Sequence, residues 1–399
     1  MLACDETGQP AGNRLKIYYK PSPPFTHVVR SHGGGQPMID PSEHLVVDCD
    51  WHYADTFTQV APYMPEPWKT KFQKSGWGGT GVKQNLSAFF PASTGNRFNY
   101  GKIEREFSEY PDGGDDKQDI VEGMDHLDID VTLQISHLIL AMGGISADDR
   151  RVEAFVEGYI DYMLEEVLDP DEGIYGLAPM PYHDIDASLD VLDRIEDEEA
   201  FVGVVMVTAG ASPPLGNRKY DPIYERCEEE GYPVVYHTGG SGLDDYVRAG
   251  YQDMIETHTL GFLESNMSQI VSVACQGVAE KFPDLEIVFM ESGVTYIPGL
   301  VSRINEEYLK RSEEAPLLEK KPGDYITDFY FGTQPLEVSA RPDLLEVCFD
   351  MIGTDRMLYA SDYPHWDFDS PSVITDLPML SDEDRKNILG QNAVEVFDL

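Results

Sequence analysis

Positively charged side chains are scarce in this sequence. Its 399 residues include 29 Lys and Arg against 72 Asp and Glu, which gives a formal net charge of −43 at pH 7. Proteins that bind nucleic acids by neutralising phosphates need basic patches, and so do proteins that bind anionic membrane surfaces. The shortage of cations therefore excludes both classes of partner.

Long apolar runs and paired cysteines are also missing. No apolar stretch approaches the ~18 residues that span a bilayer. The first residues, MLACDETGQPAGNRLK, lack the apolar core of a signal peptide. The five cysteines are odd in number and scattered, and no Cys-x-x-Cys pair occurs. We therefore expect a cytoplasmic protein without a disulfide framework.

Acidic residues are abundant and spread along the chain, in runs such as DGGDDKQD, IEDEEA and RCEEEG. Such runs typically form solvated helix faces. Repulsion among so many like charges would strain a compact fold at low ionic strength. It costs little at molar salt, where the Debye length is about 3 Å. The composition favours a protein from a halophile, and an acidic mesophilic enzyme is the alternative.

Strand-like and helix-like segments alternate along most of the chain. Strands are expected at 44–52, 131–138, 174–181, 201–208, 233–237, 285–291, 329–333 and 357–362. Helical periodicity separates them, at 147–167, 186–197, 221–230, 262–281, 294–311, 342–352 and 382–397. Eight strands joined by helical crossovers predict a (β/α)8 TIM barrel, an α/β fold. A doubly wound open sheet is the alternative, but no Gly-x-Gly-x-x-Gly follows the first strand.

Two segments fall outside this alternation. Residues 1–43 are rich in Gly, Pro and Ser, and we interpret them as an N-terminal arm before a barrel domain at 44–399. Residues 53–114 are rich in aromatic residues, Gly and Pro. A long segment of this kind is typical of a functional loop, so we expect a long first βα loop that acts as a lid. The other interpretation is a subunit contact, in keeping with an expected homo-oligomer, a dimer.

Polar side chains stand at the ends of several predicted strands. Asp50 and His52 share one face of the first strand, His237 ends the fifth, and Asp362 ends the eighth. Active sites of barrels lie at the carboxyl ends of the strands. Imidazoles and carboxylates together suit a divalent cation, which would also relieve repulsion between the acids. We expect zinc, with Mn²⁺ or Fe²⁺ as alternatives. Each residue taken alone fits a structural role equally well.

Several segments together resemble the amidohydrolase-related family, also called amidohydrolase 2, which includes the aminocarboxymuconate-semialdehyde and resorcylate decarboxylases. They are VVDCDWH, YDPIYERCEEEGYPVVYHTGG, KFPDLEIVFMESGVTYIPGLVSRI, MLYASDYPHWDFDSP and KNILGQNAVEVF, in the family's order over residues 44–399. The resemblance implies a metal-dependent barrel enzyme. It also implies that Asp50 and His52 are the strand-1 ligands, His237 the third ligand and Asp362 the fourth.

Glu291, at the end of the sixth strand, departs from the family pattern, because the decarboxylases carry a proton-handling histidine there. We therefore expect first a hydrolase of a small cyclic or aromatic organic acid, in which Asp362 takes a proton from metal-activated water. The alternative is a non-oxidative decarboxylase in which Asp362 or Glu291 delivers a proton to carbon. A non-catalytic ligand-binding barrel is the third interpretation. The structural alternative for Glu291 is an ion pair with Arg303.

Three further histidines are candidate contacts for the small-molecule substrate. His183 lies at the end of the third strand, His258 on a predicted loop after the fifth, and His365 just beyond the eighth. His126 and His137 are interpreted as structural.

Overall fold

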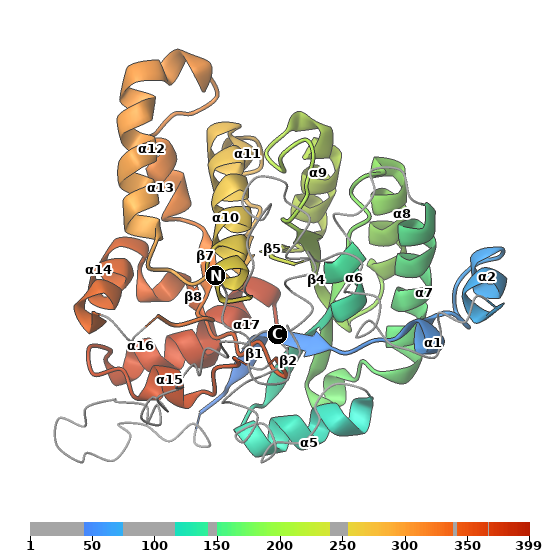
Figure 1. The fold of residues 1–399 in the computed structure, drawn as a ribbon. Helices are drawn as coiled ribbons and strands as arrows, with labels where there is room; N and C mark the ends of the chain where they lie inside the picture. Colours follow the sequence, from blue (N-terminus) through green and yellow to red (C-terminus); the bar gives the residue numbers. More distant parts are fainter. Residues whose placement is uncertain (1–43, 75–115, 143–149, 240–253, 338–340, 366) are drawn as a thin grey trace, which may run out of the picture. The chain divides into compact units, whose positions relative to one another are not determined.

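The computed structural model describes residues 44–74, 116–142, 150–239, 254–337, 341–365 and 367–399 (Figure 1). The chain divides into two units, Met1–Pro37 and Met38–Leu399, and every described residue belongs to the second. The predicted arm at 1–43 and residues 75–114 of the predicted lid lie outside the described residues, so both stay predictions.

A single parallel sheet of eight strands forms the centre of this unit. Each strand pairs in parallel with the next one along the chain, so the spatial order is the sequence order. The strands are β1 (Val47–Tyr53), β2 (Val131–Ser136), β3 (Ile174–Pro179), β4 (Phe201–Val207), β5 (Val234–His237), β6 (Ile287–Met290), β7 (Tyr330–Gly332) and β8 (Met357–Leu358).

Backbone hydrogen bonds between β1 and the segment after β8 close the sheet. The amide of Cys49 donates to Tyr359 O over 3.0 Å, and the amide of Asp362 donates to Asp50 O over 2.9 Å. The structure is therefore a (β/α)8 barrel, which confirms the predicted fold. Closure of the barrel also places the end of β8 directly beside β1, the strand that carries the predicted metal ligands Asp50 and His52.

The strands are buried because both of their faces are covered. In β4 only Val202 is partly exposed, and all four residues of β5 are buried. Helices cover one face of each strand and the other faces the barrel interior, so such strands read as continuous apolar runs. Buried polar residues within them are therefore exceptional, and Asp50 and His52 on β1 are two of them.

Helices surround the strands in Figure 1 and mostly follow the predicted pattern. Helix α14 begins at Pro342, and Ser381 and Asp384 form a capping box at the start of α16. The helices are α1 (Phe57–Val60), α2 (Trp68–Lys74), α5 (Lys117–Leu127), α6 (His137–Met142), α7 (Arg150–Glu166), α8 (Ile185–Ile195), α9 (Asp221–Glu230), α10 (Met254–Cys275), α11 (Val278–Lys281), α12 (Ile297–Arg311), α13 (Pro322–Ile326), α14 (Pro342–Ile352), α15 (Ser372–Thr375), α16 (Asp382–Lys386) and α17 (Asn392–Phe397).

The structure differs from the sequence pattern in several places, and α13 and α15 are among the helices that were not predicted. Helices α1 and α2 occupy the start of the segment predicted as a loop, and α5 and α6 were not predicted. Helices of four to seven residues, such as α1, α2 and α6, are too short to show a 3.6-residue period. The helix predicted at 262–281 is split, because Gly277 adopts a left-handed conformation (φ +65°) between α10 and α11.

Close contact between α5 and β1 depends on a glycine. A Cβ atom at Gly123 would lie 2.8 Å from the ring of Trp51, which is fully buried on β1. Since real Cβ atoms do not approach so closely, a larger residue would push α5 away from the strand that carries Asp50 and His52. Within the described residues, no helix combines the length and hydropathy needed to cross a membrane.

Candidate metal centre

The polar face of β1 contributes three buried side chains to the mouth of the barrel. Asp48, Asp50 and His52 are each fully buried. Asp48 accepts hydrogen bonds from the amide of Ser361 (2.9 Å) and from the Ser361 hydroxyl. It therefore ties β1 to the segment after β8. Burial is the main cause that raises the pKa of Asp48 to about 6.

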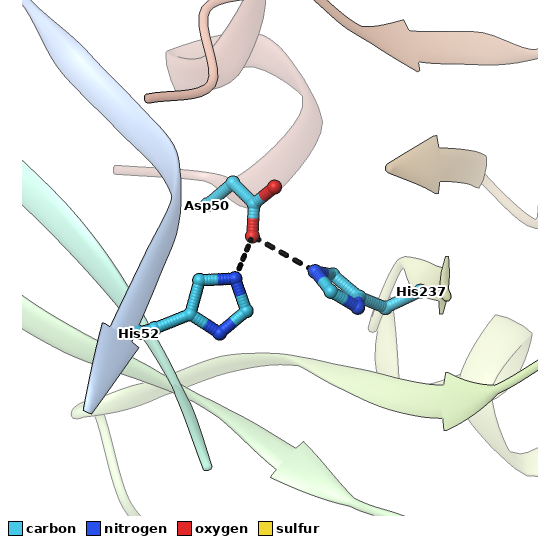
Figure 2. Close-up of side chains that lie close together, drawn as sticks. All are labelled: Asp50, His52 and His237. Carbon is cyan, nitrogen blue, oxygen red and sulfur yellow. Dashed lines mark hydrogen bonds and ion pairs between the residues drawn. The ribbon is translucent and has the colours of Figure 1, made fainter. Parts of the chain in front are cut away.

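Asp50, His52 and His237 form the first group of potential ligands. Oδ1 of Asp50 lies 3.0 Å from His237 Nε2 and 3.3 Å from His52 Nε2 (Figure 2). One donor atom from each of the three residues lies within 4.8 Å of the others, and all three residues are buried. The structure thus brings together three of the four predicted ligands.

The hydrogen bonds around this group leave room for a cation. Nδ1 of His237 is 2.5 Å from the backbone oxygen of Thr238, so Nδ1 carries a hydrogen and the lone pair of Nε2 faces Asp50. A lone pair and a carboxylate oxygen 3.0 Å apart repel each other unless a proton or a metal ion lies between them. In the described part of the chain, Asp50 Oδ2 and His52 Nδ1 have no hydrogen-bond partner, and His52 Nε2 faces carboxylate oxygens of Asp50 and Asp362. These donors fit a divalent cation.

The fourth predicted ligand, Asp362, joins the group through His52. Its Oδ1 lies 2.8 Å from His52 Nε2 and 2.5 Å from His365 Nδ1. His52, Asp362 and His365 form a second group of potential ligands within 4.8 Å of one another. His52 is therefore common to both groups. The assignment of all four predicted residues to a single ion stays a prediction.

The charges of the site depend on one another. Burial raises the pKa of Asp50, but attraction to His237 and His52 outweighs burial and holds that pKa below its ordinary value. Burial would lower the pKa of both imidazoles, but Asp50 and Glu291 raise them. For Asp362, burial and then the charge of Glu291 raise the pKa well above its ordinary value. A divalent cation would substitute for the protons that these groups otherwise hold.

Glu291 reaches the ligand group from the end of β6. Its Oε2 accepts a hydrogen bond from the Thr238 hydroxyl (2.9 Å) and lies 3.4 Å from His237 Nε2. The predicted alternative, an ion pair with Arg303, is wrong: Arg303 is exposed on α12, whereas Glu291 is buried. The backbone of Glu291 is left-handed (φ +56°), and that conformation turns the chain just after the strand.

A glycine brings the loop after β5 close to α6. A Cβ atom at Gly239 would lie 2.8 Å from the backbone oxygen of Leu140. The His-Thr-Gly sequence thus combines a ligand candidate, the threonine that binds Glu291, and a residue small enough for this contact.

The three predicted substrate contacts lie in different settings. His365 is central, because it touches Asp362 directly. His258 lies on helix α10 rather than on a loop, and its Nε2 is 3.4 Å from a carboxylate oxygen of Asp367. The ring of His183 packs on Tyr182, with 4.7 Å between ring centroids. Neither His258 nor His183 belongs to the two ligand groups found among the described residues.

The sequence interpretation missed the position of His137 and of Gln334. His137 begins α6 directly after β2, and its Nε2 lies 3.3 Å from His365 Nε2. Gln334 follows β7, and its amide donates to Asp362 Oδ2 (3.3 Å). Both stand just beyond the end of a strand, the same signal that selected His237 and Asp362.

Comparison with known proteins places this barrel in a family. The sequence profile of the amidohydrolase family matches residues 47–399. The chain belongs to the amidohydrolase family. This result confirms the resemblance and the expectation of an enzyme.

Individual relatives of this chain are distant in sequence. The gamma-resorcylate decarboxylase of Rhodococcus jostii (strain RHA1) is 23% identical over 251 residues, which cover 60% of this chain and 75% of the relative. An amidohydrolase structure from Mycobacterium avium subsp. paratuberculosis K-10 superposes with a TM-score of 0.69 at 19% identity, covering 89% of this chain and 99% of the other.

A second solved structure is a dihydroxybenzoic acid decarboxylase from Polaromonas sp. JS666, with bound manganese and the inhibitor 2-nitroresorcinol. It superposes on this chain with a TM-score of 0.63 at 18% identity, covering 89% of this chain and 97% of the other. At this level of identity, both structures establish the shared fold.

Proposed function

We propose that this chain is a metal-dependent, non-oxidative decarboxylase of a hydroxylated aromatic carboxylic acid. The observation that carries the proposal is the buried group of Asp50, His52 and His237, in a chain whose curated relatives include gamma-resorcylate decarboxylases. The sequence had favoured hydrolysis, with decarboxylation as the alternative. The relatives support that alternative better, so we rank it first.

Asp50, His52, His237 and Asp362 would hold the metal ion. When bound, a divalent cation would supply a Lewis acid that stabilises negative charge on substrate oxygens. Mixed imidazole and carboxylate donors accept either manganese or zinc. Manganese is the ion in the Polaromonas structure, so we propose to test it first and zinc second.

The reaction needs a proton at the carbon that loses its carboxylate. The bond between the ring and the carboxylate breaks, carbon dioxide leaves, and the electron pair remaining on the ring carbon takes a proton. A carboxylate that touches a cation has a low pKa, so Asp362 would be ionised as a ligand. Glu291 is outside the proposed ligand set but within 3.4 Å of His237. We assign Glu291 the role of proton carrier: it would take a proton from solvent, deliver it to the ring carbon and remain as a carboxylate.

The barrel mouth restricts which substrates are compatible. Around the ligand group lie mainly imidazoles and carboxyl groups, and the described residues place no Lys or Arg in an ion pair with Asp50, Asp362 or Glu291. The substrate anion would therefore depend on the metal and on imidazoles for its counter-charge. A small acid with oxygens on neighbouring carbons suits such a site.

The test is a product analysis of the purified chain in molar KCl with added Mn²⁺ or Zn²⁺. A panel of hydroxybenzoates that includes 2,6-dihydroxybenzoate is incubated with the protein, and carbon dioxide and the corresponding phenol are measured. Decarboxylation predicts equal amounts of both, loss of activity with a chelator, and loss of activity in Asp50→Asn. Asp376→Asn removes one exposed acid and is the matched control.

A second panel of lactones and amides separates the two reactions. Hydrolysis products from this panel, with no carbon dioxide from the first, would restore the hydrolase interpretation. A protein that neither binds metal nor turns over either panel would support the non-catalytic barrel.

A further inference from the structure

His365 links Asp362 to His137 across the barrel mouth. Nδ1 of His365 is 2.5 Å from Asp362 Oδ1, and its Nε2 is 3.3 Å from His137 Nε2. The rings of His365 and His137 meet edge to face, with 4.9 Å between their centroids. His137 and His365 are 228 positions apart, and they belong to the segments that follow β2 and β8.

The direction of these hydrogen bonds follows from the chemistry of imidazole. With a cation bound, Asp362 would be ionised and would only accept hydrogen bonds, so Nδ1 of His365 must donate to it. A neutral imidazole carries one hydrogen, which leaves Nε2 of His365 as an acceptor. His137 Nε2 must then donate to His365. With both rings neutral, one tautomer of each histidine makes both hydrogen bonds possible.

His137 is itself held firmly by the residues on either side of it. The hydroxyl of Ser136 donates to Asp55 Oδ2 (2.8 Å), and the amide of Leu138 donates to Asp55 Oδ1 (2.9 Å). Asp55 is almost fully buried, with 2% of its surface exposed. The start of α6 is thus anchored, so His137 presents a donor at a defined place.

Asp362 needs such support because its backbone is in the left-handed region (φ +65°). A residue other than glycine persists there only when its surroundings determine it. Gln334 donates to Oδ2, and His365 donates to Oδ1, so both carboxylate oxygens have a neutral donor. The His365 ring also lies over the His52 ring, with 4.1 Å between centroids.

We propose that His365 and His137 are positioning residues for Asp362. The two hydrogen-bonded imidazoles fix the Asp362 carboxylate so that its Oδ1 lies 2.8 Å from His52 Nε2 and faces the metal position. Outer partners of this kind orient metal ligands, and their loss typically lowers metal affinity by about 10–100-fold. The inference rests on the metal site of the proposed function, but not on the identity of the reaction.

The experiment measures Mn²⁺ binding without any substrate. Electron paramagnetic resonance of free Mn²⁺ gives a dissociation constant for the wild-type chain and for His137→Leu, His137→Gln, His365→Asn and the double variant His137→Leu/His365→Asn. His137→Leu should bind Mn²⁺ about 10–100-fold more weakly. His137→Gln should bind close to wild type, because its amide nitrogen replaces Nε2. His126→Leu, at an exposed histidine of α5, is the control and should bind as wild type does.

The double variant tests whether His137 acts through His365. In His365→Asn, the new side-chain amide can donate to Asp362 but cannot receive the bond from His137. His137→Leu should therefore have no further effect on Mn²⁺ affinity in the His365→Asn background. If the two substitutions instead lower Mn²⁺ affinity by independent factors that multiply in the double variant, the inference is overturned, because His137 then does not act through His365. Melting temperatures of the metal-free proteins report any general loss of structure.

The outcomes separate the inference from the proposed function. A wild-type chain that binds no Mn²⁺ overturns the metal site and the inference together. Equal Mn²⁺ affinities for the wild-type chain and His137→Leu overturn the inference alone. If His137→Leu does not fold, His137→Asn replaces it, since Asn places its amide near Nδ1 rather than Nε2. Equal affinities for the Asn and Gln variants would then contradict the proposal.

Discussion

Asp50 Oδ1 lies 3.0 Å from His237 Nε2, although 187 positions separate the two residues in the sequence. His237 uses its other ring nitrogen to donate to its neighbour's backbone oxygen, so the nitrogen that faces Asp50 is the one with a lone pair. This contact between β1 and β5 makes the barrel mouth a place where a cation is stabilising. The predictions below follow from it and from the acids around it.

Asp50→Asn should abolish stoichiometric metal binding. The substitution keeps the size of the side chain but removes the charge that both imidazoles face, and a neutral amide is a poor ligand for a divalent cation. Metal content after dialysis against Mn²⁺, measured by elemental analysis, checks this. Asp376→Asn should retain the wild-type content. A full complement of metal in Asp50→Asn would remove Asp50 from the ligand set.

Glu291→Gln should lower kcat by about 10²–10⁴-fold while metal content and fold persist. A proton carrier that acts in the transition state gives this result. In the metal-loaded protein His237 would be a neutral ligand, and Arg303 is exposed, so Glu291→Gln strands no buried cation. The ~3–5 kcal/mol loss of stability expected from a broken buried ion pair should therefore be absent. Steady-state kinetics and the melting temperature are the two measurements.

The control for that experiment is Glu229→Gln, at an exposed position of α9. It should leave both measurements unchanged. Normal turnover of a metal-loaded Glu291→Gln protein would exclude Glu291 from the mechanism, and Asp362 would then be the remaining carboxyl group to test as proton carrier.

Asp55 should make the fold less stable as the pH rises from about 4 to about 7. Burial raises its pKa from 3.8 to about 7, so the folded chain keeps a proton in this window that the unfolded chain has lost. The free energy of unfolding therefore falls with pH, by up to about 4 kcal/mol for this group. Asp55→Asn has no proton to lose and should lack this contribution.

Urea denaturation of the wild type and of Asp55→Asn at several pH values and constant salt measures the effect. Stability of the variant relative to the wild type should increase from pH 4 to pH 7. A relative stability that stays constant, or declines, would show that Asp55 ionises freely in the folded state. Asp376→Asn, an exposed acid, serves again as the control.

Stability should rise with KCl far beyond about 0.15 M, where ordinary surface pairs are already screened. The reason is the net charge of −43, whose self-repulsion weakens as the Debye length shortens. Melting temperatures measured from low to molar salt decide this. A flat or falling curve would mean that the acidic surface is not an adaptation to salt.

The sequence by itself determined the barrel fold and identified the predicted strands that end in polar residues. Strand and helix follow from local apolar periodicity, which is written in consecutive residues such as those of β4 and α7. Alternation along β1 put Asp50 and His52 on one face. Since every strand of a closed parallel barrel ends at the same rim, His237 and Asp362 were expected at that rim too.

Only the tertiary structure decided which of these side chains touch. Glu291 meets Thr238 rather than Arg303, and His365 meets His137. The alternation of side chains along a strand does not predict such contacts, because it holds only while the backbone stays extended. Glu291 and Asp362 adopt left-handed backbone conformations just past their strands. Contacts over 53 and 228 positions depend on those turns and on how the closed barrel sets one strand end against another.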